Sequence, residues 1–275
     1  MLKYMKYEIK GTYKYIFGIL ALVLLLITGL YAYGSRGNEG SIGGNLFIFL
    51  SVMILFGTAL VTFLFIVGSF RKELYEDRGY LTFTLPLTGN QIVASKLIVA
   101  LLWFFILGFA IATYNILMVL SFIPVELNIS ELFSLVDQVN ITEIAFFIIT
   151  SVLSGVYLLV LIYFSMALGK ATFRSKRIGG LWFVIFLVLN GVFAFGQFAV
   201  GGLFPYYLNI ETFNVEMMDK MNSTSSFMYN NGIGIILSSN AGMLLVNIAS
   251  SLFNIATTVA LFFGTGYLIE KKIDL

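Results

Sequence analysis

The chain has 275 residues, of which 59% are hydrophobic and only 11% are charged, and its formal net charge is +2. Soluble globular domains carry about 25% charged residues, so most of this chain must face lipid or other helices. This excludes a soluble enzyme, and the small net charge gives no indication of nucleic-acid binding. The chain has no cysteine and no histidine, which excludes disulfides, thiolate metal sites and the commonest zinc ligand and general base.

The first predicted element is an amphipathic interfacial helix over residues 1–14. On a helix, its four lysines form a cationic stripe, and Met5, Ile9, Thr12 and Ile16 form a largely apolar stripe that faces the other way. This pattern is typical of a helix that lies in the head-group plane of a membrane. The alternative is that the lysines only fix the orientation of the chain. The residues predicted to lie at the interface are Lys3, Lys6, Lys10 and Lys14.

Six charge-free apolar runs are each long enough to cross a bilayer, which takes about 20 helical residues. Because the runs are continuously apolar and lipid requires internally paired backbone groups, we expect helices. The predicted spans cover residues 15–33, 46–70, 97–125, 144–169, 178–204 and 243–269. They predict an all-α integral membrane protein with a single transmembrane domain over residues 1–275. A cleaved signal peptide is disfavoured for the first span, because five more spans follow.

The loop over residues 71–96, between the second and third spans, is the most informative part of the sequence. A mixed-charge run over residues 71–78 is expected to continue the second span as a helix. Residues 80–85 are too apolar for a solvated loop and too few to cross a membrane. They predict a contact surface for another protein, and the alternative is that they dip into the membrane surface. Thr88–Asn90 is expected to cap a short helix over residues 91–96 that enters the third span.

The basic residues indicate the orientation of the spans. All of them except Arg36 and Lys220 fall before the first span, in the loop over residues 71–96, in the short basic loop over residues 170–177, or after the last span. Basic residues collect on the cytoplasmic side, so an even number of spans predicts a multi-pass protein of the cell membrane with both termini in the cytoplasm. Contact with anionic lipid heads, or topology alone, explains the loop over residues 170–177.

The segment over residues 205–242, between the fifth and sixth spans, is expected outside the cell. It contains a polar stretch and then an apolar run over residues 233–237. This run is too short to cross a membrane, so we interpret it as an interfacial or re-entrant piece.

No Asp, Glu, Lys, Arg or His lies inside any predicted span. Ion-coupled carriers usually hold a buried ionisable group, and membrane hydrolases need a nucleophile with a base, an Asp pair or a metal. We therefore predict no catalytic and no metal-binding residue, and we do not expect an enzyme. The chain also lacks a phosphate-binding loop, so any energy for transport must come from another subunit.

Polar side chains within the spans are candidates for a substrate path. Helix packing is sufficient to explain the hydroxyl groups on one face of the second span. The amides of the fifth span cost more to bury, so we expect them at a helix interface or along a water-accessible path. The candidate path residues are Thr58, Thr62, Asn190 and Gln197.

The segment from Glu73 to Pro86, with Lys96 opening the third span, is similar to the coupling-helix region of ABC transporter permeases. With six spans and a basic amphipathic N-terminal helix, the chain resembles the type V exporter class, which shares the fold of ABCG-like transporters. The resemblance implies a cytoplasmic coupling helix between spans two and three and an extracellular helical segment over residues 205–242. The residues it implies at the ATPase contact are Glu73, Leu74, Tyr75, Glu76, Asp77, Arg78, Gly79, Tyr80, Leu81 and Phe83.

The same resemblance implies a separate ATPase subunit in two copies, which binds Mg-ATP, so no cofactor is expected on this chain. It also implies a second permease, which a homodimer would supply. Small bacterial members of the class export antimicrobial or amphipathic peptides such as phenol-soluble modulins, and others confer self-immunity to peptide antibiotics.

The leading hypothesis is therefore a permease that exports a hydrophobic or amphipathic peptide by alternating access, driven by a partner ATPase. The alternative is a non-transporting membrane immunity or scaffold protein that binds a peptide or sensor partner. A secondary carrier is disfavoured by the uncharged spans.

Overall fold

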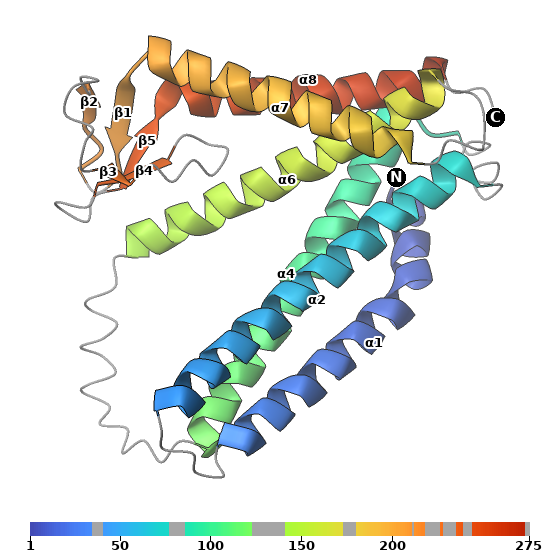
Figure 1. Cartoon of the computed structure of the whole chain (residues 1–275). Coiled ribbons are helices and arrows are strands. Elements are labelled where there is room, and N and C mark those ends of the chain that lie inside the picture. Colours follow the sequence, from blue (N-terminus) through green and yellow to red (C-terminus); the bar gives the residue numbers. More distant parts are fainter. Residues whose placement is uncertain are drawn as a thin grey trace. The chain divides into compact units, whose positions relative to one another are not determined.

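A computed structural model describes residues 1–34, 41–76, 86–122, 141–172, 180–210, 212–217, 226–227, 235–238 and 244–272. Six long helices account for most of them (Figure 1). Each contains a segment long and apolar enough to cross a membrane, as predicted, so the chain is a multi-pass membrane protein. The helices are α1 (Leu2–Gly34), α2 (Ser41–Tyr75), α4 (Gly89–Phe122), α6 (Ile141–Thr172), α7 (Leu181–Leu203) and α8 (Ile248–Lys271).

The chain divides into two compact units. Unit 1 comprises Met1–Glu73 and Ala94–Ile129, and unit 2 comprises Leu74–Val93 and Ser130–Leu275. Unit 1 thus contains α1 and most of α2 and α4, whereas unit 2 contains α6, α7, α8 and the strands. The last residues of α2 and the first residues of α4 belong to unit 2, so both helices pass from one unit into the other.

Helix α1 joins the predicted interfacial helix and the first span without a break. The four lysines of its first half are all exposed. On the opposite side, Met5 and Ile9 pack against a buried cluster that contains Ile16 of α1 and Val99 and Trp103 of α4. Both predicted stripes are therefore present, and the apolar one packs against another helix of unit 1. A position of the lysines in the head-group plane stays a prediction.

Helices α2 and α4 are longer than the predicted spans, because α2 continues to Tyr75 and α4 begins at Gly89. At the start of α4, the Thr88 N–H donates to Gln91 Oε1 (3.2 Å) and the Gln91 N–H donates to Thr88 Oγ1 (3.4 Å). This reciprocal pair is a capping box. The predicted cap is therefore confirmed, but it starts α4 itself, and residues 91–96 belong to that same continuous helix.

The predicted fold is confirmed as mostly helical, but the described residues of the segment over residues 205–242, which was predicted to be helical, include strands. The described residues of this segment contribute to a five-stranded antiparallel sheet in the order β2-β1-β5-β4-β3. Its last strand replaces the first turn of the predicted sixth span, so α8 begins at Ile248 instead of residue 243. The strands are β1 (Tyr206–Asn209), β2 (Val215–Met217), β3 (Ser226–Phe227), β4 (Ile235–Ser238) and β5 (Leu244–Asn247).

The short apolar runs of this segment explain the error. Runs as short as those of β4 and β5 fit a buried strand or a piece of helix equally well by periodicity. Pro205 stops α7, and the aromatic pair Tyr206 and Tyr207 favours the strand that follows. At the other end of the sheet, Asn247 caps α8, because its Oδ1 accepts the Ser250 N–H at 2.8 Å.

Candidate functional site

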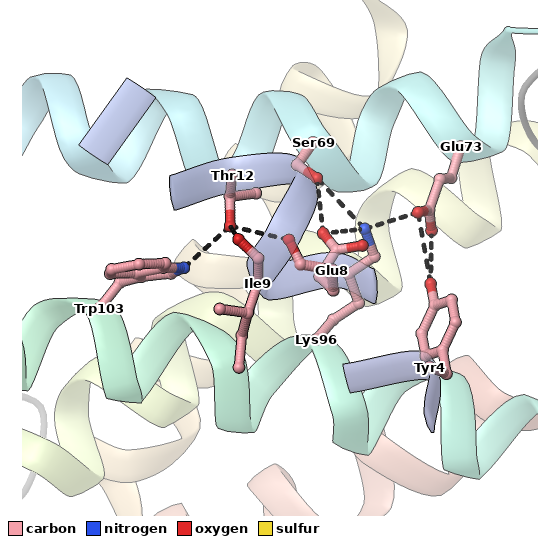
Figure 2. Close-up of polar contacts among 8 residues, drawn as sticks. All are labelled: Tyr4, Glu8, Ile9, Thr12, Ser69, Glu73, Lys96 and Trp103. Carbon is pink, nitrogen blue, oxygen red and sulfur yellow. Dashed lines mark hydrogen bonds and ion pairs between the residues drawn. The ribbon is translucent and has the colours of Figure 1, made fainter. Parts of the chain in front are cut away.

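A buried lysine joins the three helices of unit 1. The side chain of Lys96 on α4 is only 3% exposed. Its Nζ lies 2.6 Å from Glu8 Oε1 of α1, 2.7 Å from Glu73 Oε1 of α2 and 3.2 Å from Ser69 Oγ of α2 (Figure 2). An ammonium group has three N–H donors, so every donor of Lys96 has an acceptor within reach.

Hydroxyl groups also donate hydrogen bonds to the two carboxylates. Ser69 Oγ donates to Glu8 Oε1 (2.9 Å), and the Tyr4 hydroxyl donates to Glu73 Oε2 (3.1 Å). Helices α1 and α2 each contribute two residues four positions apart, Tyr4 with Glu8 and Ser69 with Glu73, and this spacing places each pair on one helix face. We call these residues the Lys96 cluster: Tyr4, Glu8, Ser69, Glu73 and Lys96.

The polar seam continues for one more turn of α1. Trp103 Nε1 of α4 donates to Thr12 Oγ1 at 2.9 Å (Figure 2). Thr12 Oγ1 also lies 2.9 Å from the backbone oxygen of Glu8, to which it can donate its own hydrogen. Both residues of this hydrogen bond, Trp103 and Thr12, are buried. The bond therefore fixes the position of α1 along α4 just beyond the ion pairs. The buried cluster around Ile16 then follows on the same side of α1.

The electrostatics of the Lys96 cluster favour a structural clamp. Two carboxylates share one ammonium, so the cluster carries one net negative charge when both glutamates are ionised. Burying ionised groups is costly, and removing one partner leaves an uncompensated charge. Within the described part of the chain, no group of three or more acidic side chains is placed to hold a metal ion. The arrangement can therefore fix α1, α2 and α4 together.

The residues predicted to contact an ATPase divide between buried, exposed and undescribed positions. Leu74 is buried and Glu73 is 14% exposed and engaged in the Lys96 cluster. The Tyr75 hydroxyl donates to the backbone oxygen of Met166 on α6 (3.1 Å), whereas Glu76 is exposed. The remaining predicted contact residues lie outside the described residues: Asp77, Arg78, Gly79, Tyr80, Leu81 and Phe83.

Both ends of the connection between α2 and α4 are attached to helices of unit 2. At the first end, Tyr75 bonds to Met166, and Lys170 Nζ of α6 lies 5.5 Å from the centre of the Tyr75 ring, within the range of a cation–π contact. At the second end, the Gly89 N–H donates to Glu270 Oε2 of α8 at 3.4 Å. Helix α6 therefore contacts Tyr75, which precedes the connection, and α8 contacts Gly89, which follows it.

Glu8 is not among the predicted site residues, although one signal in the sequence marks it. Glu8 is the only acidic residue among the lysines of residues 1–14, and it lies on the side of the helix that carries Ile9, Thr12 and Ile16. A carboxylate within an apolar stripe indicates a buried partner, because an unpaired buried charge is very costly. The predicted spans are free of charge, but the folded helices extend beyond them and bury Lys96 among carboxylates.

The predicted path residues lie in different units. In unit 1, Thr58 and Thr62 of α2 are buried, and Thr58 Oγ1 donates to the backbone oxygen of Ile54 at 2.6 Å. In unit 2, Asn190 of α7 is half-buried and Gln197 is buried. Each pair faces the packed side of its own helix, as expected for helix packing, and a role along a substrate path stays a prediction.

A second polar cluster joins α7 to α8 within unit 2. Asn247 Nδ2 donates to the carbonyl oxygens of Gly201 (3.3 Å) and Phe204 (3.1 Å), which belong to the end of α7. Ser250 Oγ of α8 donates to the backbone oxygen of Gln197 (3.2 Å). One asparagine therefore satisfies the carbonyl groups that the end of α7 leaves unpaired, while its Oδ1 caps the start of α8.

Two neighbouring glycines of α7 provide a matched test of this packing. A Cβ atom at Gly201 would lie 2.5 Å from Ser250 Oγ, whereas a Cβ atom at Gly202 would meet nothing within 4 Å. Gly201→Ala is expected to cost about 1–3 kcal/mol, because Ser250 must move and lose its bond. Gly202→Ala is expected to be neutral or to stabilise by up to about 1 kcal/mol. Thermal unfolding in detergent measures both, and equal effects would contradict the described contact.

The geometry above identifies a multi-pass membrane protein whose three N-terminal helices are joined by a buried ion cluster. Comparisons with protein-family models, with curated proteins and with solved structures found no match to this chain.

Proposed function

We propose that this chain is the permease subunit of an ATP-driven ABC exporter that moves hydrophobic or amphipathic peptides across a bacterial cell membrane by alternating access. A separate ATPase, in two copies, would bind Mg-ATP, and a second copy of the chain would complete the transport path. Six helices able to cross a membrane and the similarity of residues 73–86 to a coupling-helix region support the proposal.

The observation that carries the proposal is the attachment of the residues on either side of the α2–α4 connection. Glu73 and Lys96 join α2 to α4 and, through Glu8, to α1 in unit 1. Tyr75 and Gly89 join the same two helices to α6 and α8 in unit 2. A force applied to the connection by a partner would therefore reach helices of both units, which is what a permease without its own motor requires.

The proposed cargo contacts are the polar groups of α2 and α7. Thr58 and Thr62 lie on one face of α2, and Asn190 and Gln197 lie on α7. A polypeptide cargo needs hydrogen-bond partners and apolar surface, and these uncharged residues would supply the former without binding an ion.

Reconstitution tests the proposal directly. The chain is placed in liposomes with and without a candidate ABC ATPase subunit, and uptake or release of a labelled amphipathic peptide is followed together with ATP hydrolysis. We expect peptide-stimulated hydrolysis and transport only when both subunits are present. Transport by this chain alone, or a stable complex with a peptide that never moves, would contradict the proposal; the second result would instead favour an immunity or scaffold protein.

Charge reversal at Glu76 tests the proposed ATPase contact. Glu76 is exposed at the end of α2, so Glu76→Lys is expected to weaken binding of the ATPase about tenfold, or about 1.4 kcal/mol, without lowering the melting temperature. Glu216→Lys is the matched control, because Glu216 is an exposed glutamate on β2. Co-purification measures both variants, and equal retention of the ATPase by Glu76→Lys and the unchanged chain would count against the contact.

A further inference from the structure

The uncovered face of α7 is apolar up to the end of the helix. Phe195, Phe198 and Leu203 are each at least 67% exposed. The helix has 23 residues and is therefore about 34 Å long, slightly more than the hydrocarbon core of a bilayer at about 30 Å. A helix of this length can cross the hydrocarbon core, so its exposed apolar face suits lipid, and Leu203, its last residue, would lie close to the boundary between acyl chains and head groups.

The neighbouring strands β1 and β5 adjoin the end of α7 and the start of α8 (Figure 1). Strand β1 begins at Tyr206, directly after α7 and the Phe204–Pro205 link, and β5 ends at Asn247, which caps α8. Because Asn247 also donates to the carbonyl oxygens of Gly201 and Phe204, the strand ends are fixed to both helix ends. The first residues of β1 therefore lie at the depth of the head groups.

Strand β2 forms an edge of the sheet and carries an exposed apolar face. Its Met217 lies opposite Tyr206 of β1, and opposite residues of an antiparallel pair share a face. Val215 lies two positions away on that face, whereas Glu216 lies on the other face. Tyr206 is 46% exposed, Val215 57% and Met217 66%.

The turn that joins β1 to β2 presents a further aromatic side chain. Phe213 is 66% exposed and has a φ of 53°, a left-handed conformation that costs energy for a residue with a bulky side chain. Two hydrogen bonds hold the turn: the Asn209 N–H donates to Asn214 O (2.9 Å) and the Thr212 N–H donates to Asn209 Oδ1 (3.4 Å). The exposed position of the ring is therefore imposed by the turn.

We propose that the hairpin of β1 and β2 lies in the head-group layer of the membrane, with one apolar face inserted toward the acyl chains. We call this face the hairpin patch, and it consists of Tyr206, Val215 and Met217, with the exposed Phe213 in the turn beside it.

Lipid is the occupant because the hairpin patch continues the lipid-facing surface of α7. Leu203 and Phe204, both more than half exposed, connect the two surfaces along the chain. Tyr is favoured at the boundary of the bilayer, because its ring can lie in apolar surroundings while its hydroxyl reaches water. The carboxylate of β2, Glu216, lies on the opposite face and can remain in water. The inference does not depend on transport, because it concerns only the position of the sheet.

Labelling at three consecutive positions tests the proposal. The chain contains no cysteine, so Val215→Cys, Glu216→Cys and Met217→Cys each give a single labelling site on the full chain. Each variant is reconstituted in phosphatidylcholine–phosphatidylglycerol vesicles and labelled with a nitroxide. Collisions of the label with oxygen, which concentrates in acyl chains, are compared with collisions with a water-soluble nickel complex. We expect a several-fold higher ratio of oxygen to nickel collisions at 215 and 217 than at 216.

Each other outcome overturns the proposal. High nickel accessibility at all three positions would show a sheet that stands in water. Protection of positions 215 and 217 from both reagents would show that protein, such as a second copy of the chain, covers the hairpin patch. The three side chains are exposed in the folded chain, so the substitutions do not disturb the core, and an unchanged melting temperature of each variant confirms this.

Discussion

Lys96→Met is expected to lower the free energy of unfolding by about 3–5 kcal/mol. The substitution leaves Glu8 and Glu73, whose oxygens lie 2.6 and 2.7 Å from the lysine nitrogen, as two neighbouring carboxylates without a cation. Their repulsion acts where α1, α2 and α4 meet, so the loss falls on the packing of unit 1. Thermal or denaturant unfolding in detergent measures the change. Lys72→Met is the matched control, because Lys72 is exposed on α2 and its loss is expected to change stability by no more than about 0.5 kcal/mol.

A second variant separates lost charge balance from lost packing. Glu8→Gln and Glu73→Gln, added to Lys96→Met, remove every charge of the Lys96 cluster while keeping side chains of similar size. Replacing a complete buried ion cluster by neutral groups is often close to neutral, so the triple variant is expected to recover most of the stability. Equal stability of Lys96→Met and Lys72→Met would show that the cluster does not clamp the helices, and failure of the triple variant to recover would assign the effect to packing.

The sequence was sufficient to predict the spans but not the helix ends. Mean hydropathy identifies residues that suit lipid, and the six apolar runs therefore appeared as six helices. A helix can continue past the membrane wherever its backbone hydrogen bonds form and its side chains suit their surroundings. The largely polar residues from Arg71 to Tyr75 meet this condition at the end of α2. The cap at the start of α4 could be predicted, because Thr88 gives a local signal. The burial of Lys96 in the same helix could not, because it depends on partners that are distant in the sequence.

The Lys96 cluster could not be predicted, because its members are far apart in sequence. Lys96 and Glu8 are 88 positions apart, and nothing local to either residue specifies the other. Local sequence shows only that each is a charge beside an apolar run. Their pairing arises when α1 and α4 pack through Ile16 and Trp103 and bring both onto one seam. Pairing then explains why Glu73, which the family resemblance implies at the ATPase contact, is engaged within the chain; its contact with an ATPase stays a prediction.

Gly266→Ala is expected to destabilise unit 2 by about 1–3 kcal/mol or more, because α8 and the start of α4 have no space for a methyl group between them. A Cβ atom at Gly266 would overlap Asn90 Oδ1 and lie 2.9 Å from the Asn90 backbone nitrogen. A Cβ atom at Gly89 would overlap the carbonyl oxygen of Gly266, which belongs to the backbone and cannot rotate away, so Gly89→Ala is expected to cost at least as much. Gly155→Ala on α6 is the control. Its Cβ atom would meet nothing within 4 Å, and it is expected to stabilise by about 0.5–1 kcal/mol.

These glycines also bear on the proposed function, because they hold α4 to α8 at the end of the α2–α4 connection. If a partner applies force to the connection, a methyl group at position 89 would push the start of α4 away from α8. The force would then be transmitted less well to unit 2, while the Lys96 cluster would still hold the helices of unit 1 together. Gly89→Ala is therefore expected to bind the ATPase as well as the unchanged chain does, but to lose most peptide stimulation of ATP hydrolysis at a temperature below its own unfolding. Full stimulation at that temperature would mean that the connection does not act through α8, and loss of ATPase binding would place the defect at the contact itself.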